Sequence, residues 1–366
     1  MKTLRLTVDP AHLGTPAAGR ALCRAADLLR AGGLVALPTE TVYGLGANAL
    51  DADAVARIFA AKQRPAWDPV IVHIADEGML DGLVEKAPEV ARKLMRAFWP
   101  GPLTLLLPRT GAVPDVVTAG RPLVGVRMPA HPVTLELIRR AAVPVAAPSA
   151  NLFGHTSPTC AQHVLDDLDG RIDAVVDAGP TAHGVESTVL DPCQSPMVIY
   201  RPGAVTANQI WATAGPVVIF EPRGPLAELP DEAMAGTDTL GMETPHEALP
   251  SPGVGLRHYA PSARLLLVEG AADELPARLA QAAQELVGEK LGVLLPADFA
   301  GPQGLAGAVV FVWGRWSAPE ELARTLYAGL RALDAEGCSA ILCPLPPAEG
   351  IGAAIRDRLR KAAHKG

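Results

Sequence analysis

The sequence predicts an α/β protein with two domains joined by a linker. A chain of 366 residues is expected to form about two domains. Short apolar runs alternate with amphipathic helical segments in both halves of the chain, as α/β folds require. After residue 219 comes a stretch rich in proline, glycine and acidic residues, which is typical of a linker. We therefore predict a first domain over residues 1–215, a linker over 216–262 and a second domain over 263–366.

The first domain is expected to be a twisted, mostly buried mixed sheet with helices packed against it. Helices are predicted where apolar residues recur at helical spacing, and strands where short apolar runs end at glycine or proline. Asp51 can cap the helix that follows it. The predicted helices cover residues 19–32, 87–98, 133–141 and 158–168, and one more helix follows Asp51, has Val55, Ile58 and Phe59 on its apolar face and ends before Lys62. The predicted strands cover residues 34–37, 70–74, 103–107, 124–128, 144–147, 174–176, 188–190 and 198–200.

The second domain is expected to be a small parallel sheet, because its strands alternate with helices. The predicted strands cover residues 265–268, 291–295, 309–313 and 340–343, and the predicted helices 274–287, 319–335 and 352–363. Gly301, Gly304 and Gly307 do not have the spacing of a dinucleotide-binding fingerprint, and they precede a strand. The last helix is basic, with Arg356, Arg358, Arg360, Lys361 and Lys365, and we interpret these residues as a solvated helix end.

The composition and net charge narrow the classes of function that this protein can have. The net charge of −7 argues against tight, direct nucleic-acid binding over the whole surface. The five cysteines are scattered, with no Cys-x-x-Cys pair or accompanying histidine cluster, so a zinc site is not expected. Neither a signal peptide nor an apolar run of about 18 residues is evident, so we expect no membrane association and a cytoplasmic location.

Three cations stand at places where they need a partner. Lys62 and Arg64 follow the helix that Asp51 caps, and two neighbouring cations repel each other unless an anion lies between them. They are either a solvated helix end or a phosphate clamp. Arg127 lies inside an apolar strand, where it either forms a structural ion pair or grips a carboxylate with its planar fork.

Several motifs occur in the same order as in a known family. They are Pro38-Thr-Glu-Thr41-Val-Tyr43-Gly-Leu, Lys62-x-Arg64-Pro, Gly125-Val-Arg127-Met-Pro, Ser149-Ala-Asn151, Ser187-Thr-Val, Tyr200-Arg201-Pro-Gly and Ser251-Pro-Gly…His258-Tyr259-Ala-Pro261. Together they resemble the YrdC-like domain of threonylcarbamoyl-AMP synthases. The last motif is similar to the two-domain branch, in which a Rossmann-like domain follows the YrdC-like one.

The resemblance implies a set of site residues. The catalytic residues would be Lys62, Arg64 and Arg127. Threonine would contact Thr41, His73, Arg127 and Ser187. ATP would contact Lys62, Arg64, Asp68, Ser149, Asn151, Ser157, Arg201, His258 and Tyr259. Magnesium would arrive with ATP, and no metal-ligating residue or tightly bound cofactor is assigned. Asp68 would repel phosphate but could help a magnesium ion. The segment 251–261 would act as a lid over ATP.

The implied reaction joins L-threonine, bicarbonate and ATP into threonylcarbamoyl-AMP and pyrophosphate. The product would serve threonylcarbamoyladenosine modification of tRNA, through downstream tRNA threonylcarbamoyl transferase proteins. An RNA-binding, translation-associated module is the main alternative, and the net charge weighs against it. A carbamoyltransferase of hydrogenase maturation should add cysteine-rich zinc fingers, which this sequence lacks. A purely structural scaffold would leave the three cations unexplained.

Overall fold

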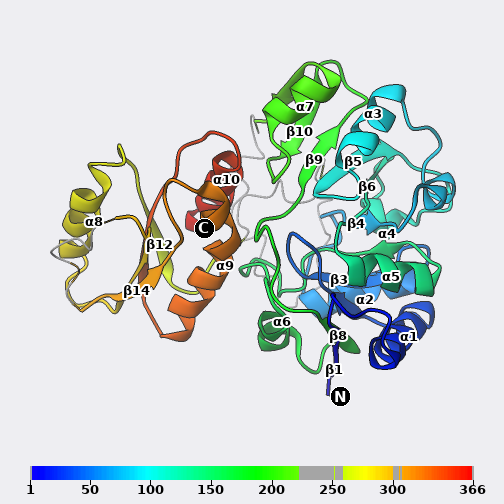
Figure 1. The fold of residues 1–366 in the computed structure, drawn as a ribbon, viewed down its shortest axis with the longest axis horizontal. Coiled ribbons are helices and arrows are strands. Elements are labelled where there is room, and N and C mark those ends of the chain that lie inside the picture. The colour runs from blue at the N-terminus through cyan, green and yellow to red at the C-terminus, as the bar shows by residue number, and fades with distance from the viewer. Residues whose placement is uncertain (1, 222–250, 252–258, 300–304, 306, 365–366) are drawn as a thin grey trace, which may run out of the picture.

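The computed structural model describes residues 2–221, 251, 259–299, 305 and 307–364. In these residues it contains two α/β domains, a large mixed sheet and a separate small parallel sheet, as the sequence predicts (Figure 1). Most of the predicted linker lies outside the described residues, and so does His258. No helix in the described ranges has the length and apolar character needed to cross a membrane.

The first domain is organised around an extended, twisted sheet. Its strands are β1 (Leu4–Thr7), β2 (Val35–Leu37), β3 (Gly44–Asn48), β4 (Ile71–His73), β5 (Leu103–Pro108), β6 (Leu123–Arg127), β7 (Val145–Ala146), β8 (Ala174–Asp177), β9 (Thr188–Asp191), β10 (Met197–Arg201) and β11 (Val217–Ile219). Among the described residues they form one 11-stranded sheet in the order β1-β8-β2-β3-β7-β4-β6-β5-β9-β10-β11. The sheet is mixed, because β4 pairs parallel with β6 whereas β5 pairs antiparallel with β6.

Helices pack on this sheet and bury its apolar faces. They are α1 (Pro16–Arg30), α2 (Ala52–Lys62), α3 (Glu89–Phe98), α4 (Asp115–Thr118), α5 (Pro132–Ala141), α6 (Ala161–Leu168) and α7 (Ala207–Ala214), with a 3-10 turn over Glu77–Gly82. The predicted cap of α2 is confirmed, because the Asp51 carboxylate accepts from the backbone N–H groups of Asp53 and Ala54. The predicted apolar face of α2 is confirmed too, since Val55 and Ile58 are fully buried.

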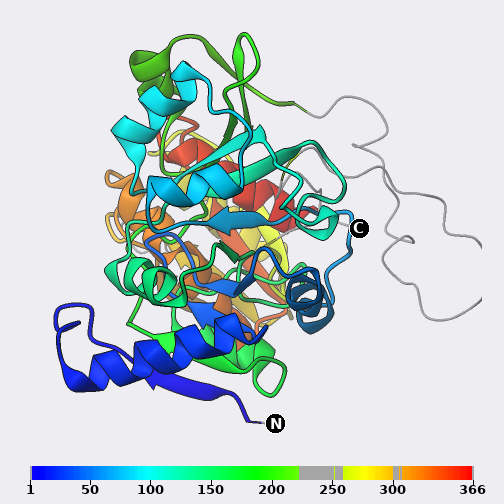
Figure 2. The ribbon, with the colours of Figure 1, turned by 90° about the vertical axis from the view of Figure 1, so that its right-hand side faces the viewer.

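The second domain has four parallel strands in the described residues. They are β12 (Arg264–Val268), β13 (Leu291–Leu295), β14 (Val309–Val312) and β15 (Ala340–Pro344), in the order β12-β15-β13-β14. Its helices are α8 (Leu275–Gln284), α9 (Pro319–Ala335) and α10 (Gly352–Ala363). Figure 1 shows α9 and α10 on the side that faces the first domain and α8 on the far side. Figure 2 looks from the side of the first domain, and the second domain lies behind its sheet.

The structure contains elements in the first domain that were not predicted, namely β1, β3, β11, α4, α7 and the 3-10 turn. Among them, β3 pairs antiparallel with β2. Glycine at 46 allows this close packing, because a Cβ atom there would lie 2.8 Å from Val145 Cγ1 and 2.9 Å from a Leu37 methyl group. The first sheet also extends beyond the predicted boundary at residue 215, since β11 pairs parallel with β10.

A shared apolar core joins the two domains. Val42 and Val185 of the first domain belong to the same buried cluster as Trp313 and Leu326 of the second. Gly184 lies directly against α9, because a Cβ atom there would be 2.5 Å from the Ala323 carbonyl oxygen. At Gly184 this contact leaves no space for a larger side chain. The second domain is therefore docked on the loops of the first.

The basic terminal helix was expected to be solvated, and this is wrong for Arg358. Its side chain is fully buried and pairs with Glu186 of the first domain, with Nε 2.7 Å from Oε2. Lys361 is also largely buried and pairs with Asp357 at 2.9 Å. By contrast, the Arg360 side chain remains 60% exposed, as a solvated helix end requires. The face of α10 turned to the first domain is thus part of the interior.

Candidate active site

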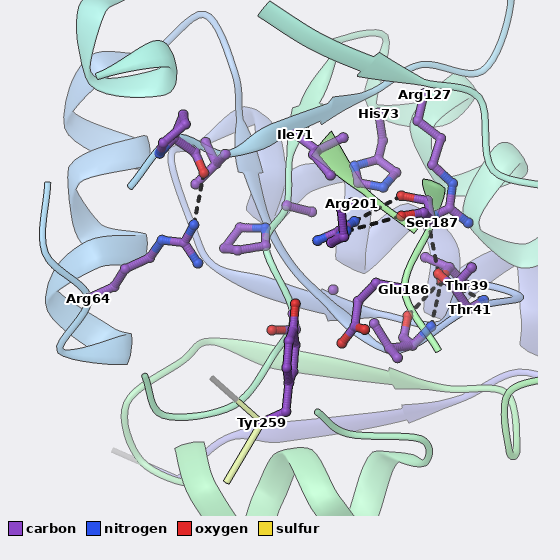
Figure 3. A pocket seen from close by; sticks show the side chains of 17 residues that line it. Thr39, Thr41, Arg64, Ile71, His73, Arg127, Glu186, Ser187, Arg201 and Tyr259 are labelled. Carbon is purple, nitrogen blue, oxygen red and sulfur yellow. Dashed lines mark hydrogen bonds between the residues drawn. The ribbon is translucent and has the colours of Figure 1, made fainter. Parts of the chain in front are cut away.

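The principal pocket lies at one edge of the first sheet, where several strands begin or end. His73 and Arg127 lie opposite each other at the carboxyl ends of the parallel strands β4 and β6. β10 ends at Arg201, opposite Val189 near the start of β9. Strand ends from distant parts of the sequence therefore meet at this edge, as is usual for ligand sites in α/β sheets. Figure 3 shows the pocket, which opens to solvent and has about 590 Å³ of empty space when its open part is included.

Most of the predicted site residues are brought together here. The pocket is lined by Thr41, Arg64, His73, Arg127, Ser149, Ser187, Arg201 and Tyr259 from the predicted set. They come from at least six separate motifs, and only the folded sheet places them side by side. Their contacts with threonine or ATP stay predictions, because the structure fixes only their positions.

Arg127 forms the structural ion pair that the sequence allowed, and it also lines the pocket. Its Nη2 pairs with Glu40 Oε1 at 2.6 Å, its Nη1 donates to Thr41 Oγ1 at 3.0 Å, and its Nε donates to the Gly101 carbonyl at 3.1 Å. Burial alone would raise the pKa of Glu40, but Arg127 outweighs it and the pKa is lowered. The guanidinium is thus held in one orientation by an anion, with its edge at the pocket (Figure 3).

His73 and the hydroxyl groups form the neutral polar wall beside Arg127. Burial, together with the charge of Arg127, lowers the pKa of His73 to about 3, so its ring is uncharged at pH 7. Its Nδ1 atom is buried and has no hydrogen-bond partner in the described part of the chain. Ser187 Oγ lies 2.8 Å from Thr104 Oγ1 and accepts from Arg201 Nη2 at 3.1 Å. This wall can receive the amine and hydroxyl of a small amino acid.

Arg64 lines the opposite end of the pocket. Its Nη2 lies 2.9 Å from Asp68 Oδ1 and donates to the Pro69 carbonyl at 2.8 Å. Asp68 is fully buried and does not line the pocket. Burial raises the pKa of Asp68, and the charges of Arg64 and Lys62 oppose that rise only in part. Asp68 therefore acts here as the residue that orients Arg64.

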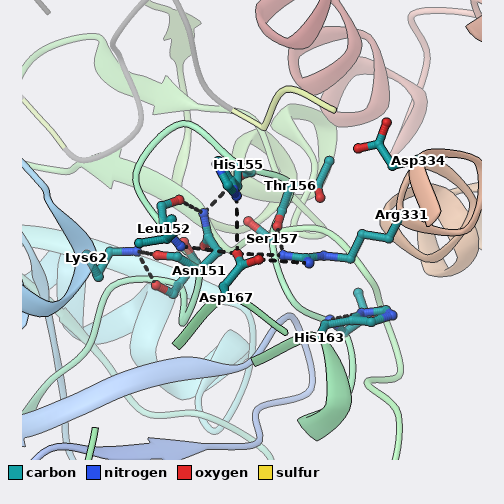
Figure 4. Close-up of polar contacts among 12 residues, drawn as sticks. Lys62, Asn151, Leu152, His155, Thr156, Ser157, His163, Asp167, Arg331 and Asp334 are labelled. Carbon is teal, nitrogen blue, oxygen red and sulfur yellow. Dashed lines mark hydrogen bonds and ion pairs between the residues drawn. The ribbon is translucent and has the colours of Figure 1, made fainter. Parts of the chain in front are cut away.

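Lys62 is not at a surface cleft, which corrects the expectation that it lies beside Arg64 in the open. Its side chain is 1% exposed, and its ammonium donates to the carbonyl oxygens of Ser149, at 2.6 Å, and Asn151. Burial, together with the charge of Arg64, lowers the pKa of Lys62 well below its usual value. In Figure 4 the ammonium points into the loop of Asn151. Lys62 holds this loop in place and does not line the pocket.

Asn151 and Ser157 also lie just behind the pocket wall and do not line it. Asn151 Nδ2 donates to the carbonyl of His155 at 2.8 Å, which closes the loop on itself. Ser157 is fully buried and donates to Glu186 Oε1 at 2.5 Å. Both residues shape the loop that carries Ser149. Their predicted direct contact with ATP would require this loop to rearrange; otherwise they would affect ATP only by positioning the loop.

Sequence reasoning missed several residues that the structure places in or beside the pocket. They are Thr39, Glu40, Thr104, Glu186 and, from the second domain, Tyr327 and Arg358. Glu40 and Glu186 directly precede Thr41 and Ser187, which were predicted as site residues. An acidic side chain next to a predicted anion site is unusual, and this feature of the sequence could have identified both. Nothing local in the sequence marks Tyr327 or Arg358, because both act across the domain interface.

The side chains around the pocket show how a magnesium ion could be held there. No group of three or more His, Cys, Asp or Glu side chains in the described residues is arranged to hold a metal ion. Two carboxylates that line or back the pocket, Asp68 and Glu186, are paired with Arg64 and Arg358. This set suits a magnesium ion held mainly by substrate phosphates and water, which is its usual manner of binding in nucleotide sites.

Two family models match the chain. Residues 27–203 match a model described as "Telomere recombination", and residues 217–364 match one described as "Threonylcarbamoyl-AMP synthase, C-terminal domain". The first match covers most of the large sheet, and the second covers the small parallel sheet together with β11 of the large one.

Curated relatives match over both domains. The threonylcarbamoyl-AMP synthase of Bacillus subtilis is 44% identical over 345 residues, covering 93% of this chain and 92% of that protein. That of Pyrococcus abyssi is 42% identical over 345 residues, covering 93% of each. The crystal structure of P. abyssi Sua5 complexed with L-threonine is similar with a TM-score of 0.83 and 39% identity, covering 99% of this chain and 98% of that one. The chain belongs to the threonylcarbamoyl-AMP synthase family.

Proposed function

We propose that this protein makes threonylcarbamoyl-AMP and pyrophosphate from L-threonine, bicarbonate and ATP. The threonine amine takes up carbon dioxide derived from bicarbonate, which gives a carbamate and leaves water. A carbamate oxygen then attacks the α-phosphorus of ATP, and the bond to the β-phosphate oxygen breaks. The enzyme needs no covalent intermediate for this reaction, because it can act by holding two anions in line and stabilising the charge that develops.

One observation carries the proposal: Arg64, Arg127 and Arg201 converge on a single pocket together with a neutral histidine and several hydroxyl groups. Arg127 suits the threonine carboxylate, because a planar guanidinium fits a carboxylate plane. Arg64, at the opposite end of the pocket from Arg127, and Arg201, beside Ser187, would contact the phosphates of ATP. Buried arginines of this kind do not form the open, basic and aromatic surface of a single-strand RNA binder, so the RNA-binding alternative gains no support.

ATP would bring magnesium with it, and the ion would neutralise charge on the departing pyrophosphate. We assign ATP contacts to Arg64, Ser149, Arg201 and Tyr259, which line the pocket. Lys62 and Asn151 would act on ATP through the loop that they hold. The product would pass to tRNA threonylcarbamoyl transferase proteins. Such a role would place the enzyme in the cytoplasm.

Pyrophosphate release tests the proposal directly. Full-length protein is incubated with ATP, magnesium and bicarbonate, and then with L-threonine, L-serine or L-valine. Threonine should give the highest rate, and mass spectrometry should detect threonylcarbamoyl-AMP only when bicarbonate is present. Release that ignores both the amino acid and bicarbonate would show a different ATP-consuming activity. ATP binding without any release would indicate a nucleotide-binding module.

A further inference from the structure

We infer, on the basis of the proposed function, that the second domain contributes to the active site through Arg358, a positioning residue that neutralises and holds Glu186 in the pocket wall. Glu186 lines the pocket and directly precedes Ser187. Arg358 comes from α10 of the other domain and does not line the pocket itself. Its effect on ATP would therefore act through Glu186.

The contacts of Glu186 show how firmly it is held. Arg358 Nε donates to Oε2 at 2.7 Å, and Tyr327 Oη donates to the same oxygen at 3.0 Å. Ser157 Oγ donates to Oε1 at 2.5 Å. Thus two of the three residues that hold the carboxylate belong to the second domain. The Arg358 guanidinium also lies over the ring of Tyr259, 5.2 Å from its centroid, and Tyr259 lines the pocket.

The charge of Glu186 explains why such a partner is needed. The side chain is only 7% exposed, and a buried carboxylate in the wall of an ATP site would repel the triphosphate strongly, since little water screens it. Burial would raise the pKa of Glu186, but Arg358 and Arg201 outweigh it and the pKa is lowered. The carboxylate is therefore ionised, and Arg358 supplies the nearest compensating charge.

The domain interface keeps Arg358 in position. Its side chain is fully buried and also contacts Asp357 Oδ2 at 2.5 Å through Nη1. The tight approach of Gly184 to α9 and the shared apolar core fix α10 relative to the pocket. A second ion pair crosses the same interface, where Arg331 Nη2 lies 3.0 Å from Asp167 Oδ2 (Figure 4). That pair holds the domains together without reaching the pocket.

Arg356 provides a matched control on the same helix. It donates to the Pro346 carbonyl at 2.8 Å and pairs loosely with Glu269 at 3.4 Å, and these partners lie within the second domain. Arg358→Met and Arg356→Met each replace an arginine on α10 by the same side chain. Only the first leaves Glu186 without its cation. General weakening of α10 should affect both variants, whereas a role in the site should affect Arg358→Met alone.

The test is a double-mutant cycle on the full-length protein. We measure KM for ATP, KM for threonine and kcat in the parent, Arg358→Met, Arg356→Met, Glu186→Gln and the Arg358→Met/Glu186→Gln double variant. We expect Arg358→Met to raise KM for ATP by about tenfold or more, and KM for threonine by less. In the Glu186→Gln background the same substitution should change KM for ATP by less than about threefold, because no buried charge remains to be neutralised.

The opposite results would overturn the inference. If Arg358→Met raises KM for ATP equally with and without the Glu186 carboxylate, Arg358 acts on overall docking. The same holds if Arg356→Met has an equal effect. If Arg358→Met alone does not fold, KM for ATP is compared between Glu186→Gln and the double variant, in which both charges are absent. A difference of more than about threefold would still overturn the inference. If the parent releases no threonine-dependent pyrophosphate, the proposed function fails separately, and calorimetric titration of ATP into the same variants tests the inference.

Discussion

Replacing Arg127 by lysine tests the threonine side of the pocket, because it keeps the positive charge but removes the planar fork. Arg127 is 3% exposed and uses three different nitrogens on Glu40, Thr41 and the Gly101 carbonyl. A lysine ammonium has a single nitrogen on a flexible stem. We expect it to stay near the Glu40 carboxylate, because an uncompensated buried carboxylate is costly. The face offered to threonine would then be lost.

The expected magnitude follows from the contacts. A hydrogen bond that involves a charged group contributes about 1.5–3 kcal/mol. Loss of one such bond to the threonine carboxylate should weaken threonine binding roughly 10- to 150-fold. ATP binding should change less, because Arg64 lies at the opposite end of the pocket and keeps its contacts. The lost contacts to Thr41 and the Gly101 carbonyl should cost about 1 kcal/mol of stability each.

Calorimetric titrations of threonine and of ATP into the variant measure both effects, and thermal melts report folding. Arg5→Lys is the control. Arg5 grips Asp177 Oδ2 with Nε at 3.0 Å and Nη2 at 2.7 Å, on the edge strand β1 and away from the pocket. Arg5→Lys should leave threonine affinity unchanged. If Arg127→Lys folds normally and binds threonine as tightly as the parent, then Arg127 is only the structural partner of Glu40, and the reasoning is refuted.

Three further substitutions test interactions outside the pocket that stabilise the fold. Lys62→Met should lower the free energy of unfolding by about 2 kcal/mol or more, because two buried carbonyls lose their donor, and a Tm unchanged in thermal melts would contradict this. Asp167 has a pKa of about 2, because its hydrogen bonds to His155 and Arg331 outweigh burial. The ionised Asp167 therefore stabilises the fold by about 2 kcal/mol above about pH 4, and this stabilisation is lost as the pH falls towards 2. In Asp167→Asn the free energy of unfolding should depend less steeply on pH over that range. Equally steep curves for the parent and the variant would refute the prediction. Thr206→Ala removes the capping box of α7 and should cost about 1 kcal/mol with normal turnover; chemical denaturation and a pyrophosphate assay check both parts.

Elements with strong local patterns were predicted well. The bounds of α9, Pro319–Ala335, and α10, Gly352–Ala363, agree with the sequence prediction at both ends. Apolar residues at helical spacing and a proline near the start are local signals that packing here reinforces. β3 was missed for the converse reason: its sequence, Gly-Leu-Gly-Ala-Asn, has little strand propensity. Its strand conformation depends on pairing with β2 and β7.

The residues of the candidate site were predicted from the sequence, but their partners were not. Arg127 was an anion-binding candidate because charge in an apolar strand needs a partner, and Arg64 because it neighbours a second cation. Arg201 was a candidate only through the resemblance to the family. Which partner each cation takes is decided by contacts between distant residues. Lys62 was read as exposed, yet it is buried against the loop of Ser149 and Asn151. A cation at a helix end can turn to solvent or to the interior, and only the neighbouring chain decides.

The sequence by itself determined most of the strands and helices, the two-domain organisation and the motifs that mark the family. Only the tertiary structure decided how these parts meet. The pairing of Arg358 with Glu186 joins residues 172 positions apart and in different domains, so no local pattern could reveal it. Periodicity and composition report whether a side chain favours the interior. The partner of a buried charge depends instead on a direction and a distance of a few ångströms, which exist only after the domains have docked.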